Sequence, residues 1–217
     1  MISLLLAPIL AFSATPPDQF SHQLWPQLKK ELDAMPVFTV ANERGQPLEY
    51  EIAEKPVAMF YADVKEAQAE LKEAQKQYPE LQCDLIPVGL GSAYKLSCEG
   101  NAVVIPSKSE LVSAGAPEGV TPMGQQLPLF ACMDIMREEE GKPVLPLFMS
   151  FADCDAAVKS ATELDEPEGD GPPLEVVGLS LESVVQRLLS VDPSQGVAFS
   201  FIASSESQAY IQAYLAS

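Results

Sequence analysis

The chain contains the same order of predicted elements twice, and this internal repeat limits its possible folds more than any other feature. Apolar segments at 36–40 and 57–61 precede a helical pattern in the first half, and segments at 128–130 and 145–149 precede one in the second. The offset of roughly 90 residues is too long for a solenoid unit and suits a duplicated small domain. A duplication in which neither copy carries a chemical motif favours a scaffold or binding surface over an active site.

Each half is predicted to run strand-strand-helix-strand-helix-strand-helix. The remaining expected strands lie at 85–90, 102–105, 176–179 and 198–202, and the expected helices at 64–78, after 90, from 107, 153–164, from 181 and from 205. The segment 57–61 has almost no polar residue, as in a central strand covered on both faces. The sequence therefore predicts an α/β fold of two pseudo-symmetric halves, with mixed sheets covered by helices.

Residues suited to capping mark the starts of several predicted helices. Asp63 and Glu66 form a predicted capping box for the helix 64–78, and Ser107 and Glu110 form another. Asp153 is the predicted N-cap of the helix that continues to about 164.

The expected domain organisation has four parts: a signal peptide at 1–14, an N-terminal amphipathic helix at 15–34, a first half-repeat at 35–117 and a second at 127–217. The uncharged apolar run at 2–12 is shorter than the about 20 residues that span a bilayer and suits a signal peptide. An N-terminal core strand is the alternative.

The segment after the predicted signal peptide has one apolar face. Its apolar side chains recur at helical spacing, at Phe20, Leu24, Trp25, Leu28 and Leu32. Pro26 is expected to kink or interrupt this helix. The face either packs on the body of the protein or is available to a partner.

The charge balance excludes some classes of partner. The net charge is −18, from 31 acidic and 13 basic residues, and the longest basic run is Lys29-Lys30. Phosphate binding needs clustered Lys and Arg, so the sequence predicts no nucleic acid partner and no docking on anionic lipid. No segment after residue 12 is apolar over the about 20 residues that span a bilayer, so no stable membrane insertion is predicted either. The acidity either only keeps the chain in solution or attracts basic segments of a partner.

Four cysteines are compatible with export, and they would allow three pairings into two disulfides. Cys83 and Cys98 bracket one strand-turn-helix unit and are the best-placed pair. Buried thiols without disulfides are the alternative. Without a C-x-x-C motif, the sequence predicts neither a zinc site nor thioredoxin-type chemistry.

No enzyme motif stands out. His22 is the only histidine, and it lies in the N-terminal segment, away from any position that the main fold would give a catalytic base. Gly89-Leu90-Gly91 follows a strand and precedes a helix, which hints at an anion site, but a tight turn is the simpler interpretation. We predict no catalytic residue, no metal and no cofactor.

The core segments resemble those of a known family. The residues that carry the resemblance are 36–40, 57–63 with the Ala- and Gln-rich helix that follows, 86–96 and 127–130. The chain is similar to the soluble twenty-two-kilodalton component of the translocon at the inner chloroplast envelope and its cyanobacterial relatives, the Tic22-like family. The similarity covers about residues 36 to 160 and extends more loosely to the end.

This resemblance implies a chaperone-like protein of the periplasm, thylakoid lumen or plastid intermembrane space. Its partners would be unfolded or translocating proteins and the import or outer-membrane assembly machinery. The associated fold is α/β, with pseudo-twofold halves and apolar grooves.

The leading hypothesis is binding of extended apolar client segments. The candidate client-binding residues, or groove cover, are Phe20, Leu24, Trp25 and Leu28, with Tyr210 and Tyr214 as further candidates. One alternative is a structural subunit of a membrane-associated photosynthetic or translocon assembly. The other is an enzyme with a carboxylate site that no motif marks, whose Asp and Glu pKa values would be strongly shifted within a pocket.

Overall fold

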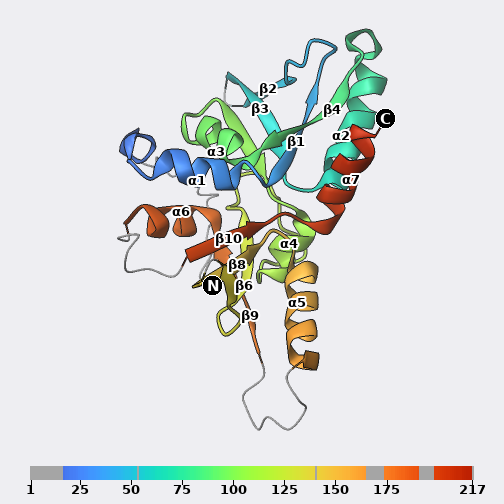
Figure 1. Cartoon of the computed structure of the whole chain (residues 1–217). Coiled ribbons are helices and arrows are strands. Elements are labelled where there is room, and N and C mark those ends of the chain that lie inside the picture. Colours follow the sequence, from blue (N-terminus) through green and yellow to red (C-terminus); the bar gives the residue numbers. More distant parts are fainter. Residues whose placement is uncertain (1–16, 53, 140, 165–173, 191–197, 217) are drawn as a thin grey trace, which may run out of the picture.

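The computed structural model describes residues 17–52, 54–139, 141–164, 174–190 and 198–216. It contains two five-stranded mixed sheets with helices against them, one sheet above the other in Figure 1. The predicted α/β class with two related halves is confirmed. The predicted signal peptide, residues 1–14, lies outside the described residues.

The first sheet has the order β2-β3-β1-β4, with β5 parallel to β3 and the other pairs antiparallel. Its strands are β1 (Pro36–Ala41), β2 (Glu49–Ile52), β3 (Lys55–Tyr61), β4 (Asp84–Gly89) and β5 (Ala102–Ile105). The helices of this half are α2 (Val64–Gln77), α3 (Leu90–Cys98) and α4 (Lys108–Ser113), and a 3₁₀ turn η2 (Pro79–Leu81) follows α2. The short, mostly polar strand β2 was not predicted.

The second sheet repeats this topology, with the order β10-β8-β6-β9 and β7 paired to β8. Its strands are β6 (Pro128–Cys132), β7 (Arg137–Glu139), β8 (Lys142–Phe148), β9 (Val176–Ser180) and β10 (Ala198–Ile202). Its helices are α5 (Phe151–Leu164), α6 (Leu181–Ser190) and α7 (Ser205–Leu215). The register repeats as well, because Phe38 pairs with Tyr61 in the first sheet and Phe130 with Phe148 in the second. The strands of each sheet lie within 35–117 and 127–217, and the use of these bounds as domain limits stays a prediction.

The last helix of each half lies against the other half (Figure 1). Helix α7 packs beside α2, where the Tyr210 and Phe38 rings meet edge to face with their centroids 5.4 Å apart. Helix α4 lies next to the second sheet, because a Cβ on Gly178 of β9 would be 3.4 Å from the Ala114 Cβ. Helices α4 and α7 are thus exchanged between the halves, because each packs against the half to which it does not belong in sequence.

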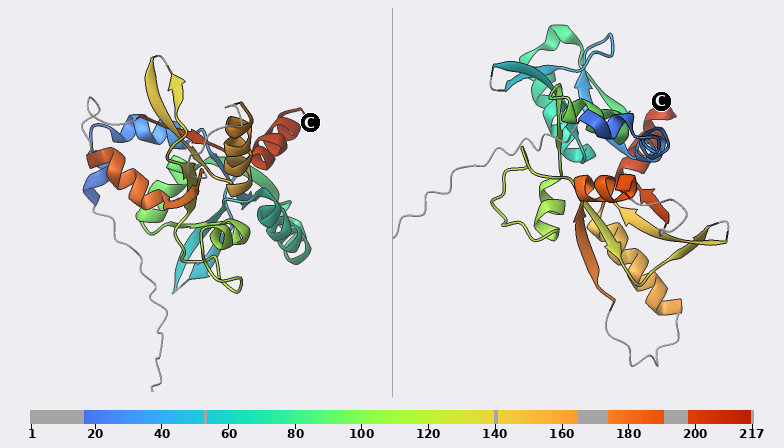
Figure 2. Two further views of the ribbon diagram at one scale, coloured as in Figure 1. Left: turned by 90° about the horizontal axis from the view of Figure 1, so that it is seen from below. Right: turned by 90° about the vertical axis from the view of Figure 1, so that its left-hand side faces the viewer.

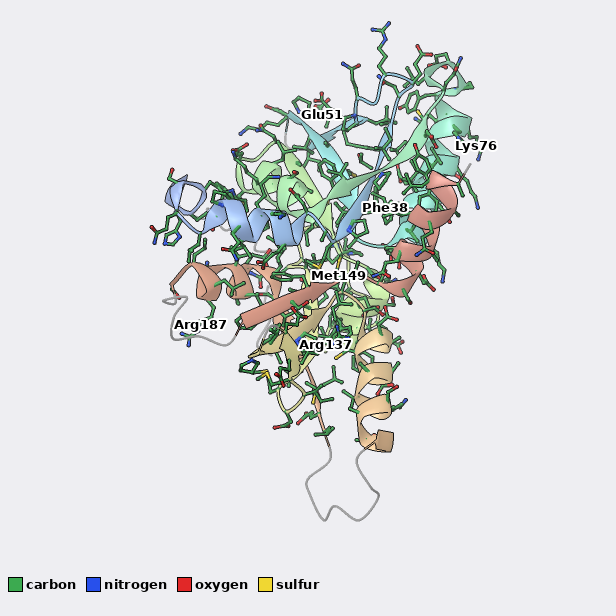
Figure 3. The ribbon with its side chains drawn as sticks, in the orientation of Figure 1. Phe38, Glu51, Lys76, Arg137, Met149 and Arg187 are labelled. Carbon is green, nitrogen blue, oxygen red and sulfur yellow. The ribbon has the colours of Figure 1, made fainter. Side chains whose placement is uncertain are left out.

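Alternation along β1 divides the first half's core between the two faces of its sheet. Val37 enters a cluster that contains residues of both halves, whereas Phe38 and Val40 enter a cluster beneath α2 and α7. We call the first of these the shared cluster; its members include residues of β1, β3, β5, β6 and β8 and of the helices α1 (Trp25–Leu32), α3 and α6. Met149, between the two sheets in Figure 3, belongs to it.

The structure does not form the predicted disulfide between Cys83 and Cys98. Cys83 is buried in the cluster beneath α2, while Cys98, at the end of α3, packs against the shared cluster on the opposite face of the sheet. The Cys98 Sγ instead accepts a hydrogen bond from Gln19 Nε2 at 3.7 Å.

Candidate functional site

The N-terminal segment folds as a 3₁₀ turn η1 (Pro17–Ser21) and the helix α1. The single helix predicted at 15–34 is interrupted before Pro26, as the proline was expected to do, because a bend and turn at 22–24 separate η1 from α1. The helix begins at Trp25, so Pro26 lies in its first turn, where backbone N–H groups have no intrahelical acceptor to lose.

The predicted apolar face of this segment is divided between core and surface. Trp25 and Leu28 are only 4% and 5% exposed and belong to the shared cluster, whereas Phe20 and Leu24 are half-buried. Phe20 contacts Trp25 edge to face at 4.8 Å between ring centroids, and Trp25 lies 6.2 Å from Tyr94 of α3. Trp25 and Leu28 therefore hold α1 in place, and only the outer members of the face are accessible to a client.

The contact between α1 and α3 fills the anion site that Gly89-Leu90-Gly91 hinted at. The Ser92 N–H, in the first turn of α3, donates to Asp33 Oδ1 at 2.8 Å, and Asp33 also pairs with Lys29. The anion at this helix N-terminus is therefore a side chain of the protein itself.

Several half-buried large apolar side chains pack against the shared cluster near α1. They come from α6, from β10 and from the turn before α1, and α1 and α6 lie side by side in Figures 1 and 2. We call this group of residues the α6 surface; its members are Phe20, Leu188, Leu189, Phe199 and Phe201. Such side chains can contact an apolar segment without displacing the core.

A second apolar surface lies on α7. Tyr210 is half-buried, Tyr214 is 38% exposed and Leu215 is 79% exposed, and the two tyrosine rings stack at 6.2 Å between centroids. We call Tyr210, Tyr214 and Leu215 the α7 surface. Exposed apolar groups in such a row are typical of interaction sites.

Four helix N-termini surround a mostly polar cavity of about 410 Å³ between the halves. An acid from one helix accepts a hydrogen bond from the first residues of the next. Glu66 of α2 accepts from the Lys108 N–H of α4 at 3.0 Å, and Glu110 of α4 accepts from the Phe151 N–H of α5 at 2.8 Å. In a capping box the acid accepts the backbone N–H of the N-cap residue. The carboxylates of Glu66 and Glu110 bond to other helices instead, so neither predicted capping box is completed.

The remaining two links close this arrangement into a ring. Asp153 of α5 accepts from the Ser205 N–H and Oγ of α7, both at 2.8 Å, and Glu206 of α7 pairs with Lys65 of α2. The prediction that Asp153 is the N-cap of α5 is wrong. The helix begins at Phe151, and Ser150 Oγ accepts the Asp153 N–H. We call these four links the capping ring; they orient four helices that belong to both halves.

Burial raises the pKa of Glu66 and of Glu110, and the backbone N–H groups that bond them partly oppose this rise. Raised carboxyl pKa values in a pocket are the feature expected of an acid–base site. Both carboxylates, however, are occupied by helix N-termini, where N–H groups lack intrahelical acceptors.

Among the described residues, no cluster of three or more His, Cys, Asp or Glu is placed to hold a metal ion.

Sequence reasoning did not select Leu188, Leu189, Phe199 and Phe201. Their apolar spacing looks the same whether a helix or strand is fully or partly covered. The exposure of these residues depends on which segments pack beside α6 and β10.

Comparison with known proteins agrees with this architecture. A model of the Tic22-like family matches residues 24–213. The solved structure of Anabaena Tic22, described as a protein of protein transport, superposes with a TM-score of 0.68 at 21% identity over 87% of this chain and 96% of that one. Tic22 from Plasmodium falciparum superposes with a TM-score of 0.70 at 18% identity over 88% and 98%.

At these identities the two structures show the fold. No curated protein sequence matches the chain. Within the part of the chain that the structure describes, no helix is long and apolar enough to cross a membrane.

Proposed function

Since this chain belongs to the Tic22-like family, we propose that it acts in protein transport as a chaperone-like factor outside the cytosol, in the periplasm, thylakoid lumen or plastid intermembrane space. Its clients would be unfolded or translocating polypeptides, including outer-membrane proteins. The description of Anabaena Tic22 as a transport protein supports this proposal. The observation that carries it is the α6 surface, which offers half-buried apolar groups beside the buried shared cluster.

Client binding would use the apolar surfaces that are accessible without unfolding. A client segment would bury its own apolar side chains against Leu188, Leu189 and Phe199, gaining about 25 cal/mol for each Å² of apolar surface removed from water. Phe20, a member of the same surface, would add to this contact and Leu24 would border it. Tyr210, Tyr214 and Leu215 would offer a second contact. The net charge of −18 would keep the loaded complex in solution.

The test is suppression of aggregation. A urea-unfolded outer-membrane barrel protein is diluted into buffer with the purified chain, and light scattering is followed. Suppression at near-stoichiometric amounts is expected. No suppression at several-fold excess would contradict client binding and favour a subunit with one fixed partner, recognised by a single tight interface on co-purification.

Surface variants locate the site. Leu189→Ser is expected to weaken suppression severalfold, and Tyr214→Ser is expected to weaken it less, because only the first residue borders the shared cluster. Met123→Ser is the matched control, since Met123 is exposed in the segment between the halves. Equal activity of all three variants would exclude both surfaces. Trp25→Ala is a poor probe, because removing a buried Trp side chain costs about 3–5 kcal/mol of stability.

A further inference from the structure

The internal repeat identifies matching positions in the two halves. Tyr50 of β2 pairs with Val57, and Arg137 of β7 pairs with Val144. Both valines follow the same Lys-Pro dipeptide at the start of the third strand. Arg137 is therefore the counterpart of Tyr50.

The helices that follow give a second matching pair. Helix α2 starts at Val64 and α5 at Phe151, so Glu70 and Ala157 are the seventh residues of their helices. In the first half the Tyr50 hydroxyl donates a 2.7 Å hydrogen bond to Glu70 Oε1, which joins β2 to α2. Tyr50 also packs against the cluster beneath this helix, so that its ring fills the space between strand and helix.

The second half lacks both members of this pair and contains a cavity of about 280 Å³ at the corresponding place. Its walls are mainly apolar and include Phe148, Cys154, Ala157 and Val158, with Arg137 at the edge of the sheet. Figure 3 shows Arg137 beside the second sheet. Arg137 is exposed, and its side chain forms no ion pair or hydrogen bond with any described residue, whereas its backbone belongs to the β7–β8 pairing.

We propose that this cavity binds an apolar group that ends in a carboxylate. The carboxylate would face Arg137, where Glu70 faces Tyr50 in the first half, and the apolar group would occupy the space that the Tyr50 ring fills there. A cavity of about 150 Å³ accepts benzene, so the volume here holds an aryl group or a short acyl chain. The guanidinium of Arg137 matches a carboxylate through two parallel hydrogen bonds.

Two sources share this chemistry: the C-terminus of a polypeptide with an apolar last residue, and a free fatty acid. Met133 and Met136, exposed in the segment between β6 and β7, would add an adaptable apolar contact near the cavity. The chain's net negative charge repels anions at long range, so binding is best measured at about 0.15 M salt, where the Debye length is about 8 Å.

Calorimetric titration of the full chain tests the proposal. The ligands are a short peptide ending in Phe with a free carboxylate, the same peptide amidated, and octanoate. Binding of at least one carboxylate ligand is expected, and the peptide acid should bind at least tenfold more tightly than its amide if the peptide is the ligand class. Binding by peptide acid alone identifies a polypeptide C-terminus, and binding by octanoate alone identifies a fatty acid.

Variants link binding to the cavity. Arg137→Gln should reduce carboxylate affinity at least tenfold, and Arg187→Gln, with the same change of charge on α6, should not. Ala157→Glu should also block binding, because it restores the internal carboxylate found at the matching position in the first half. Folding of each variant is checked by circular dichroism.

Failure of every ligand at millimolar concentration would overturn the proposal, as would equal affinity for acid and amide or unchanged binding by Arg137→Gln. The titration needs no aggregating client, so its result is independent of the aggregation assay that tests chaperone activity.

Discussion

Gly91 allows α1 to lie directly against the start of α3. A Cβ atom at this position would lie 2.7 Å from the backbone carbonyl oxygen of Lys29, closer than real Cβ contacts come. Because that oxygen belongs to the backbone of a helix, only movement of the whole helix could relieve the contact. The glycine therefore sets the depth at which Trp25 and Leu28 enter the shared cluster.

Gly91→Ala is accordingly expected to destabilise the protein by about 1–3 kcal/mol, as overpacking of a close contact does. The measurement is urea denaturation followed by Trp25 fluorescence, which also reports displacement of α1 in the folded state. Gly119→Ala is the matched control, because nothing lies within 4 Å of a Cβ at that position. A change of less than about 0.5 kcal/mol in Gly91→Ala would contradict this account of the helix contact.

At the level of elements, three links of the capping ring supply an acceptor to the N-terminus of the next helix, and the fourth is the ion pair between Glu206 and Lys65. Glu110 of α4 is the link that joins the end of the first half to α5. Glu110→Ala leaves the Phe151 N–H without this acceptor and is expected to cost about 1 kcal/mol. Glu110→Gln keeps a carbonyl oxygen and should cost less. Equal losses of stability in the two variants, measured by urea denaturation at pH 7, would contradict the capping role.

The same carboxyl group makes stability depend on pH. Burial raises the pKa of Glu110 above its ordinary value of 4.5. The folded state therefore binds more protons than the unfolded state between the ordinary and the raised value, and the contribution of this group to stability falls as pH rises through that window. Between pH 7 and about pH 4.5, the Glu110→Gln variant should gain less stability on acidification than the wild-type chain. Glu118→Gln, exposed between the halves, is the control.

The sequence predicted the elements better than their connections, for a physical reason. Helix 64–78 and the apolar strands are local patterns, and they form where the periodicity places them. Asp63 caps α2 as predicted because the acceptor and its donors are neighbours in sequence. Glu110 and Asp153 were misassigned because their partners belong to helices about 40 and 50 residues further along the chain.

The candidate site was predictable only as a pattern. Spacing identified the face that contains Trp25 and Leu28, but could not show that α3 and α6 would cover it. The spacing of Tyr210 and Tyr214 does not indicate that α7 packs against the first half, where Tyr210 contacts Phe38. The cavity beside Arg137 appears only when the two halves are compared in register, since no local pattern marks an unfilled space.

For the whole molecule, the exchange of terminal helices couples the two halves. Helix α7 follows the second sheet in sequence but contributes Tyr210 and Ile211 to the cluster beneath α2. The shared cluster and the capping ring add further connections between the halves. Loss of either half's fold would therefore remove a covering helix from the other, and the halves should not unfold one at a time.

We therefore expect one cooperative unfolding transition, although chains above about 150 residues often show more. Trp25 fluorescence reports the shared cluster and far-ultraviolet circular dichroism reports both halves, so their urea midpoints should coincide. Ile211→Ala should shift both midpoints together, by a stability loss of about 1–2 kcal/mol, below that of a fully buried Ile because this side chain is half-buried. Gln212→Ala, exposed on the same helix, should change neither. If Ile211→Ala moved only the dichroism midpoint, the cluster beneath α2 would unfold independently of Trp25, and the coupling through α7 would be wrong.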